Sequence, residues 1–180
     1  SPLAAQELTG TLQQIKKSGK IKIGYRTTTR PMSFLDKDGK PIGYSIDLCR
    51  HIANEVKFRI GSEIDIEYVS VNAKDRFAAL NENKIDILCG ATTKTLSRAE
   101  IVDFTQLTFV TGASFMGIKG KKNWNNFDGK KIGVTKSTTT ALVLKKLFLE
   151  TSIAAEIILF DNINESISAL EKGEITAICA

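Results

Sequence analysis

Apolar positions recur along this 180-residue chain in two spacings, one typical of strands and one typical of helices. Lys20 to Gly24 alternates polar and apolar residues, as a short strand does, whereas Ser45 to Lys57 carries its apolar residues on one helix face. The two patterns then follow one another. We expect strands at 20–24, 64–69, 85–89, 129–134, 157–160 and 175–179, a β-rich stretch over 104–118, and helices at 8–18, 45–57, 73–81, 138–150 and 163–172.

Strands that alternate with helices favour an α/β fold with mostly parallel sheets flanked by helices. The strand–helix series runs twice, once on each side of residues 108–112. We therefore expect two lobes: lobe 1 over residues 1–108, a hinge region at 109–112, and lobe 2 over residues 113–180.

Composition narrows the class of protein. Hydrophobic residues make up 42% of the chain, enough to bury a core, and no stretch approaches the ~20 apolar residues of a membrane span. Ser1 to Gln6 has no charged or long apolar region, so we expect any secretory signal peptide to have been removed. The net charge of +5 allows anionic partners, but the lysines at 16–22 and at 119–122 are not interleaved with aromatic residues. We interpret them as solvated surface rather than as a nucleic-acid groove.

The cysteines do not indicate a metal site. None of the three, Cys49, Cys89 and Cys179, sits in a C-x-x-C pair, and His51 is the only histidine. We expect neither a metal nor another cofactor. Each cysteine lies in an apolar run, which favours a buried small hydrophobe. The odd count leaves at least one free thiol unless chains pair, and it does not decide whether a disulfide forms.

Polar side chains follow four of the expected strands. In open parallel sheets, ligands bind beyond the carboxyl ends of the strands, so these groups are expected at the same kind of edge. Arginine offers a planar fork for a carboxylate, and hydroxyls and helix-start N–H groups add neutral donors. The set predicts a small-anion or amino-acid pocket built from Arg26, Ala73, Arg76, Thr92, Thr93, Arg98, Ser137, Thr138 and Thr139.

Each of these residues also has a purely structural interpretation. Thr138 could serve only as a helix N-cap, and Arg26 could belong to a solvated loop. Arg76 could form a surface ion pair with Asp75 or Glu82, and Arg98 could pair with Glu100 or Asp103. The shared position after strands is what favours the functional interpretation.

Three segments, in order, resemble the periplasmic amino-acid-binding proteins of ABC transporters, which are solute-binding proteins of family 3 with a two-lobed type II fold. The segments are GYRTTTRPMSFLDKDGKPIGYSIDLCRHIA, AKDRFAALNENKIDILCGATTKTLSRAEIVDFT and FDGKKIGVTKSTTTALVLKKL. The resemblance covers most of the chain. It implies a ligand held between two lobes, an ABC permease as partner, a monomer, and a periplasmic or otherwise extracytoplasmic location.

The resemblance also implies roles for individual residues. Arg98 would hold the ligand α-carboxylate, helped by the Thr93 hydroxyl and by the backbone of Ala91 and Thr93. Thr138 and Thr139 would donate hydrogen bonds from the second lobe. Ala91 and Ala73 stand where many members carry polar residues, so the hydroxyl contact usual at Ala91 is missing. The implied ligand-binding set is Arg26, Arg76, Ala91, Thr92, Thr93, Arg98, Ser137, Thr138 and Thr139.

Arg26 and Arg76 resemble the arginine pair of the glutamate/aspartate-binding branch, which implies an acidic amino acid as ligand. Two guanidiniums beside Arg98 would bring like charge onto a cationic ligand in a desolvated site, whereas glutamate or aspartate supplies a second carboxylate. Glutamine would fit if one arginine turned outward.

The family expects an acidic residue and a return segment after the strand that ends at Ala180, so the second lobe is expected to be incomplete. Two other functions stay open. A sensor domain of a membrane receptor or kinase would use the same pocket. A cyclohexadienyl dehydratase-like enzyme would need a positioned acid or base, but no nucleophile–base pair is visible and His51 lies within an expected helix. We therefore expect a binding protein, not an enzyme.

Overall fold

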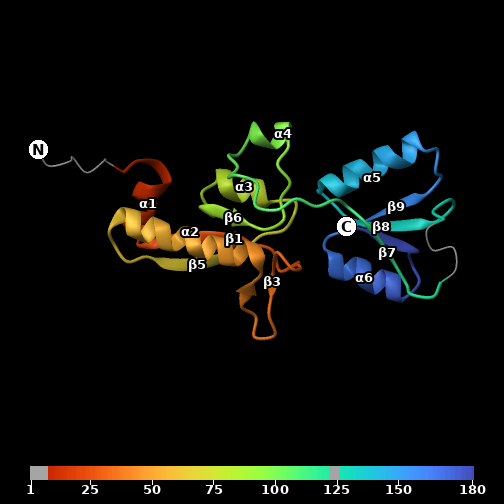
Figure 1. Cartoon of the computed structure of the whole chain (residues 1–180), viewed down its shortest axis with the longest axis horizontal. Helices are drawn as coiled ribbons and strands as arrows, with labels where there is room; N and C mark the ends of the chain where they lie inside the picture. Colours follow the sequence, from red (N-terminus) through yellow and green to blue (C-terminus); the bar gives the residue numbers. More distant parts are fainter. Residues whose placement is uncertain (1–7, 122–125) are drawn as a thin grey trace, which may run out of the picture. The chain divides into compact units, whose positions relative to one another are not determined.

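The computed structural model describes residues 8–121 and 126–180, which form two compact units (Figure 1). The first unit comprises Ser1–Val71 and Asp75–Thr92, and the second comprises Asn72–Lys74 and Thr93–Ala180. The N-terminal stretch considered for a signal peptide, and Lys122 of the second lysine group, lie outside the described residues.

The first unit is built on a parallel sheet with strand order β5-β1-β6. Ile21 and Ile23 of β1 face α1 and α2, while Val69 of β5 and Leu88 of β6 pack with α3 on the opposite side. A small antiparallel sheet, β2-β3-β4, lies between β1 and α2 in the sequence. The elements are α1 (Gly10–Ser18), β1 (Lys20–Tyr25), β2 (Thr28–Thr29), β3 (Ser33–Leu35), β4 (Pro41–Ile42), α2 (Tyr44–Ile60), β5 (Asp65–Ser70), α3 (Arg76–Asn81) and β6 (Ile87–Cys89).

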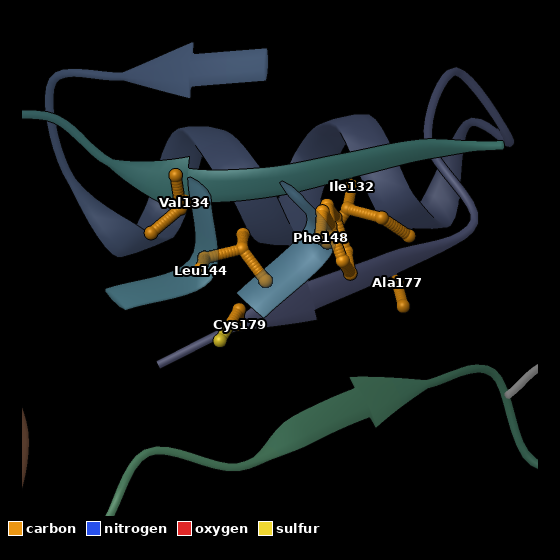
Figure 2. Packing of buried hydrophobic residues seen from close by; sticks show 6 residues of the cluster. All are labelled: Ile132, Val134, Leu144, Phe148, Ala177 and Cys179. Carbon is orange, nitrogen blue, oxygen red and sulfur yellow. The ribbon is translucent and has the colours of Figure 1, made fainter. Parts of the chain in front are cut away.

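The second unit is built on a four-stranded sheet with order β7-β10-β8-β9, in which β7 runs antiparallel to β10. Figure 2 shows one face of this sheet, where side chains of β8 and β10 pack against Leu144 and Phe148 of α5. Helix α6 covers the other face, with Leu170 against Ile178. The elements are α4 (Leu96–Ala99), β7 (Phe115–Gly117), β8 (Lys131–Thr135), α5 (Thr139–Glu150), β9 (Glu156–Phe160), α6 (Ile163–Glu171) and β10 (Ala177–Cys179).

The two units repeat one arrangement of strands and helices. The parallel strands of each unit alternate with helices, as β1-α2-β5-α3-β6 and β8-α5-β9-α6-β10, apart from the small sheet β2-β3-β4. The first of these parallel strands lies between the other two, as β5-β1-β6 and β9-β8-β10. Each middle strand carries a glycine that lies against an isoleucine. A Cβ on Gly24 would lie 2.4 Å from Ile85 Cδ1, and one on Gly133 would lie 2.6 Å from Ile175 Cδ1. Both positions therefore need the room that glycine leaves.

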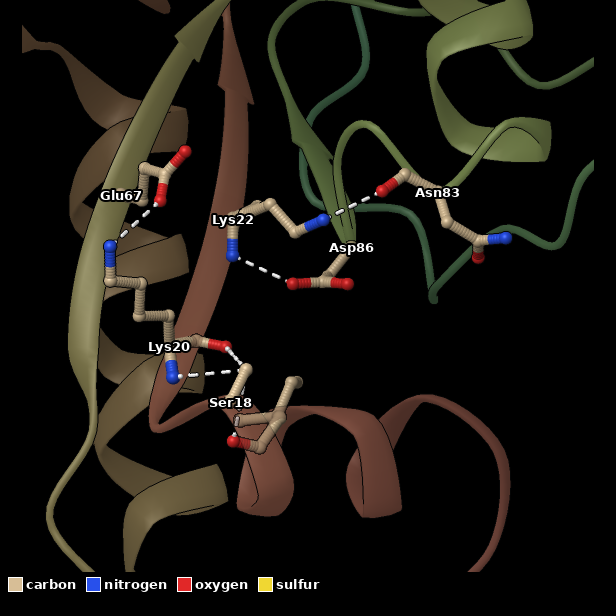
Figure 3. Close-up of polar contacts among 7 residues, drawn as sticks. Ser18, Lys20, Lys22, Glu67, Asn83 and Asp86 are labelled. Atoms are coloured by element: carbon tan, nitrogen blue, oxygen red, sulfur yellow. Dashed lines mark hydrogen bonds and ion pairs between the residues drawn. The ribbon is translucent and has the colours of Figure 1, made fainter.

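Polar contacts fix the start of β1 (Figure 3). The backbone N–H of Lys22 donates to Asp86 Oδ2 over 2.7 Å, and Lys22 Nζ donates to the Asn83 carbonyl over 2.7 Å. Lys20 Nζ lies 3.4 Å from Glu67 Oε2 on the neighbouring strand. These contacts tie β1 to both neighbours at the edge opposite to the one where the candidate residues follow the strands.

The predicted fold class, two α/β units with mostly parallel sheets flanked by helices, is confirmed. The prediction of a β-rich stretch over residues 104–118 was wrong, because within it only Phe115–Gly117 is a strand. Val110 and Leu107 there are 81% and 72% exposed, so β-favouring side chains found no sheet surface to pack on. The strand β2 after β1 and the helix α4 were not predicted. Over the described residues, no helix has the length and apolarity needed to cross a membrane.

Candidate functional site

Arg26 directly follows β1 and is half-buried. Its backbone N–H donates to Ser33 Oγ over 2.9 Å, and the Ser33 hydroxyl donates back to the Arg26 carbonyl over 3.2 Å. A Cβ on Gly90 would lie 3.3 Å from Arg26 Cγ, so the missing side chain at Gly90 leaves space for the arginine stem. Burial lowers the pKa of the Arg26 guanidinium, and the charge of Asp75 opposes that shift. The guanidinium is therefore partly removed from water while it stays charged.

Arg76 begins α3, and its side chain is buried with a residue exposure of 3%. Its guanidinium carbon lies 4.6 Å from the centroid of the Phe77 ring. Arg76 was considered for a surface ion pair, but the residue is not at the surface. Buried arginine is rare unless its charge is compensated, so this position needs an anionic or aromatic environment. Ala73 is also buried and belongs to the short segment that clusters with the second unit.

The segment after β6 is fastened to α2. Cys89, the last residue of β6, forms a disulfide with Cys49 of α2, and the Ser45 hydroxyl donates to the Gly90 carbonyl over 3.0 Å. The prediction that each cysteine is a buried small hydrophobe was therefore incomplete for Cys49 and Cys89. Cys179 is a free buried thiol. Burial raises the pKa of that thiol. Beyond the disulfide, Ala91 is exposed and Thr92 is half-buried.

Thr93 and Arg98 lie together in the second unit. Arg98 Nη1 donates to the Thr93 carbonyl over 2.8 Å, and the backbone N–H of Arg98 donates to the hydroxyl of Thr95, the N-cap of α4. Burial lowers the pKa of the Arg98 guanidinium. Thr93 Oγ1 also lies 3.1 Å from Thr139 Oγ1, a hydrogen bond in which either hydroxyl can donate. The structure thus brings Thr93, Arg98 and Thr139 into one chain of contacts.

Ser137 and Thr138 form the turn between β8 and α5. Ser137 is exposed and has φ = 59°, in the left-handed region, which lets the chain turn sharply into the helix. The interpretation of Thr138 as an N-cap is confirmed, because its hydroxyl accepts from the Ala141 N–H over 3.2 Å. The same hydroxyl donates to the Thr135 carbonyl over 2.7 Å. Donation of this proton to a ligand would require that bond to break.

The chemistry of each unit points to an anion. In the first unit, Arg26, Arg76 and Gly90–Thr92 all follow the carboxyl ends of parallel strands, so two guanidiniums share one edge with backbone groups. In the second unit, Arg98 is accompanied by hydroxyls and by the start of α5. No three His, Cys, Asp or Glu side chains gather as a metal site would require within residues 8–121 and 126–180.

Sequence reasoning missed Ser33 and Ser45, which fasten the backbone of Arg26 and Gly90. Both serines are buried. The sequence does give a partial indication of the role of Ser33, because this residue stands between the apolar residues Met32 and Phe34. A hydroxyl that is buried there must find a hydrogen-bond partner. The sequence does not say which partner it finds.

Comparison with known proteins identifies relatives along almost the whole chain. The model of the bacterial extracellular solute-binding proteins, family 3, matches residues 21–180. The L-glutamate/L-aspartate-binding protein of Pseudomonas aeruginosa is 34% identical over 98% of this chain and 60% of its own length. The glutamine-binding protein of Geobacillus stearothermophilus is 30% identical over 94% of this chain and 64% of its own length.

Among solved structures, the chain is similar to an ancestral amino acid-binding protein described as a precursor of cyclohexadienyl dehydratase. The TM-score is 0.82 at 26% identity, over 95% of this chain and 74% of that one. The chain spans 60% of the length of the Pseudomonas aeruginosa relative. The match to that relative covers 98% of this chain and so includes residues of both units described above.

Proposed function

Since the chain belongs to the bacterial extracellular solute-binding proteins of family 3, we propose that it captures an acidic amino acid, glutamate or aspartate, and delivers it to an ABC permease. The periplasmic or otherwise extracytoplasmic location predicted from the sequence agrees with the extracellular character of this family. A disulfide between Cys49 and Cys89 suits such a location, because disulfides persist in oxidising compartments.

The observation that carries the proposal is the pair Arg26 and Arg76. Arg26 is half-buried and Arg76 is buried, and both follow strands of the same parallel sheet. Keeping two guanidiniums partly out of water has a free-energy cost that a carboxylate with bidentate hydrogen bonds offsets. The side-chain carboxylate of glutamate or aspartate can meet this pair.

The identity of the relatives supports the same ligand class. The Pseudomonas aeruginosa relative carries glutamate and aspartate in its name, and the Geobacillus stearothermophilus relative carries glutamine. Glutamine has the length of glutamate but presents an amide, which cannot compensate a guanidinium charge. We therefore infer a preference for the carboxylate ligands. The roles given above to the nine candidate residues, and the lobe boundaries at 108 and 113, belong to this proposal.

We infer no catalytic role. His51, the single histidine in the sequence, is exposed in the middle of α2 rather than at the carboxyl edge of the sheet. Turnover of prephenate or arogenate by the purified protein would contradict this part of the proposal. A role as a sensor domain would use the same ligand and differs only in the partner that responds to it.

The test is a calorimetric titration of the full-length protein with L-glutamate, L-aspartate, L-glutamine, L-arginine and L-histidine. We expect glutamate or aspartate to bind most tightly. Arg98→Ala should weaken binding of glutamate about a hundredfold, because the α-carboxylate loses a desolvated charge partner. Arg59→Ala is the matched control, since Arg59 is an exposed arginine in the last turn of α2. Unaltered affinity in Arg98→Ala would contradict the proposal.

A further inference from the structure

Ser33 is a fully buried polar residue that stands between two apolar residues, Met32 and Phe34. Its exposure is 0%, and it is the first residue of β3. Burying a hydroxyl is unfavourable unless its hydrogen bonds are made. Here they are made, since Ser33 Oγ accepts from the Arg26 N–H and donates to the Arg26 carbonyl, over 2.9 and 3.2 Å. One side chain therefore satisfies both backbone groups of one candidate residue.

The strand that carries Ser33 is itself held on both sides. β3 pairs with β2 through Thr29 opposite Ser33, and with β4 through Phe34 opposite Ile42. The N–H of Leu35 also donates to the carbonyl of Thr27, next to Arg26 in sequence, over 3.2 Å. Ser33 thus connects Arg26 to a small sheet, whereas a residue directly after a strand would otherwise be free to move with its loop.

Arg26 needs such a support if it is to discriminate between ligands. An arginine side chain has several rotatable bonds, so its guanidinium is placed accurately only when the backbone and the stem are fixed. Ser33 fixes the backbone, and the open space at Gly90 accepts the stem. Neither residue brings a charge to the ligand, so their effect on binding passes through Arg26.

We propose that Ser33 is a positioning residue for specificity: by holding both backbone groups of Arg26, it places the guanidinium that distinguishes a side-chain carboxylate from an amide. This inference rests on the proposed function, in which Arg26 meets the ligand side chain. Ser33 makes no contact with the ligand itself in this account. Removal of its hydroxyl leaves the α-amino and α-carboxylate partners of the ligand in place.

A second buried serine provides the matched control. Ser166 of α6 is also 0% exposed, and its hydroxyl has no hydrogen-bond partner among the described residues. Ser33→Ala and Ser166→Ala therefore remove the same atom from equally buried positions in different units. Only Ser33→Ala deprives Arg26 of its two bonds.

The experiment measures dissociation constants for L-glutamate and L-glutamine in the full-length wild-type, Ser33→Ala, Ser166→Ala and Arg26→Ala proteins. In Ser33→Ala we expect glutamate affinity to fall about tenfold, the effect of losing bonds to buried groups, while glutamine affinity changes less than about twofold. Hydrogen exchange of the Arg26 amide should become about tenfold faster in Ser33→Ala and stay unchanged in Ser166→Ala.

The possible outcomes distinguish a failure of the proposed function from a failure of the role of Ser33. A wild-type protein that does not prefer glutamate over glutamine would overturn the proposed function and this inference with it. An unchanged ratio of the two affinities in Ser33→Ala, beside a changed ratio in Arg26→Ala, would overturn the role of Ser33 alone. So would an unchanged exchange rate of the Arg26 amide, because the proposed effect begins with the loss of that bond.

Discussion

The first and second units share one order of strands and helices but hold the residues after their strands in different ways. In the first unit the connections are long-range: Ser33 holds Arg26, Ser45 holds Gly90, and a disulfide joins residues 40 apart in sequence. In the second unit one long-range bond joins Thr93 to Thr139, 46 residues apart, and the other connections are local. Thr138 bonds to residues three positions away on either side, and the Thr95 hydroxyl accepts from the Arg98 N–H three positions later.

The two units hold these residues differently because different chemical groups follow the strands of each sheet. The first unit keeps Arg76 buried and Arg26 half-buried, and a desolvated charge needs a fixed environment because water cannot relax around it. The second unit carries hydroxyls and helix-start N–H groups beside its strands. A helix start orders these groups largely through its own cap, and the bond between Thr93 and Thr139 is the long-range contact described there. The predictions below test this contrast, from the largest effect to the smallest.

Removing the disulfide should have the largest effect, and only on the first unit. Closing a loop of 40 residues lowers the entropy of the unfolded chain, so the double variant Cys49→Ala/Cys89→Ala should lose about 4 kcal/mol of unfolding free energy. Denaturant unfolding measures the loss, and hydrogen exchange assigns it to a unit. Cys179→Ala is the control, since Cys179 is a free thiol of the second unit. Equal weakening of both units in the double variant would contradict the contrast.

The two central glycines should respond unequally to alanine. Gly24→Ala and Gly133→Ala each place a methyl group in a packed site, which costs about 1–3 kcal/mol. We expect Gly133→Ala to cost more. At both glycines the added Cβ would meet an isoleucine Cδ1, over 2.4 Å at Gly24 and 2.6 Å at Gly133. At Gly133 it would also lie 3.0 Å from the Phe160 ring, whereas at Gly24 the close contacts all belong to the flexible Ile85 side chain. Thermal unfolding of the two variants gives the comparison, and a larger loss for Gly24→Ala would show that the packing argument is wrong.

Thr138→Ala should lower the unfolding free energy by about 1 kcal/mol, the usual effect of losing an N-cap hydroxyl. Thr138→Ser keeps the hydroxyl and should be close to wild type. Thr140→Ala, at the second residue of α5, serves as the control for removing a half-buried threonine that is not the cap. The same chemical unfolding measurement covers all three variants. If Thr138→Ala and Thr140→Ala had the same unfolding free energy, the cap hydroxyl of Thr138 would not stabilise the start of α5.

The smallest effects should come from the matching cross-strand ion pairs. Lys20 with Glu67 and Lys131 with Glu156 join the middle strand of each unit to its neighbour, over 3.4 and 3.9 Å. All four side chains are exposed, so Lys20→Ala and Lys131→Ala should each change stability by less than about 0.5 kcal/mol, and by less still in high salt. A loss of several kcal/mol for either variant would mean that surface charge, rather than burial, holds the sheets.

The sequence predicted what depends on local spacing. Apolar periodicity located the main strands and helices, because a buried face imposes its period on the residues themselves. The cap at Thr138 could also be named from the sequence, as one of two interpretations, because threonine is a common N-cap residue. The prediction for residues 104–118 was wrong because β propensity stabilises a strand only where a sheet offers a surface for its side chains, and Val110 is exposed.

What the sequence did not predict depends on distant partners. Nothing near Cys49 shows that Cys89 is its partner, and nothing near Ser33 shows that Arg26 is. These pairs arise only when β6 and β3 have reached their places beside α2 and β1. The candidate arginines could be named from their positions after strands, but the burial of Arg76 and the support of Arg26 required the fold.

The most direct test of the account compares binding of L-glutamate and L-glutamine by the wild-type and Arg26→Ala proteins. If Arg26 meets the side-chain carboxylate, glutamate affinity should fall about a hundredfold in the variant, while glutamine affinity should change less than about threefold. A fall of the same size for both ligands, or for neither, would contradict the claim that the first unit holds its arginine for the ligand's second carboxylate.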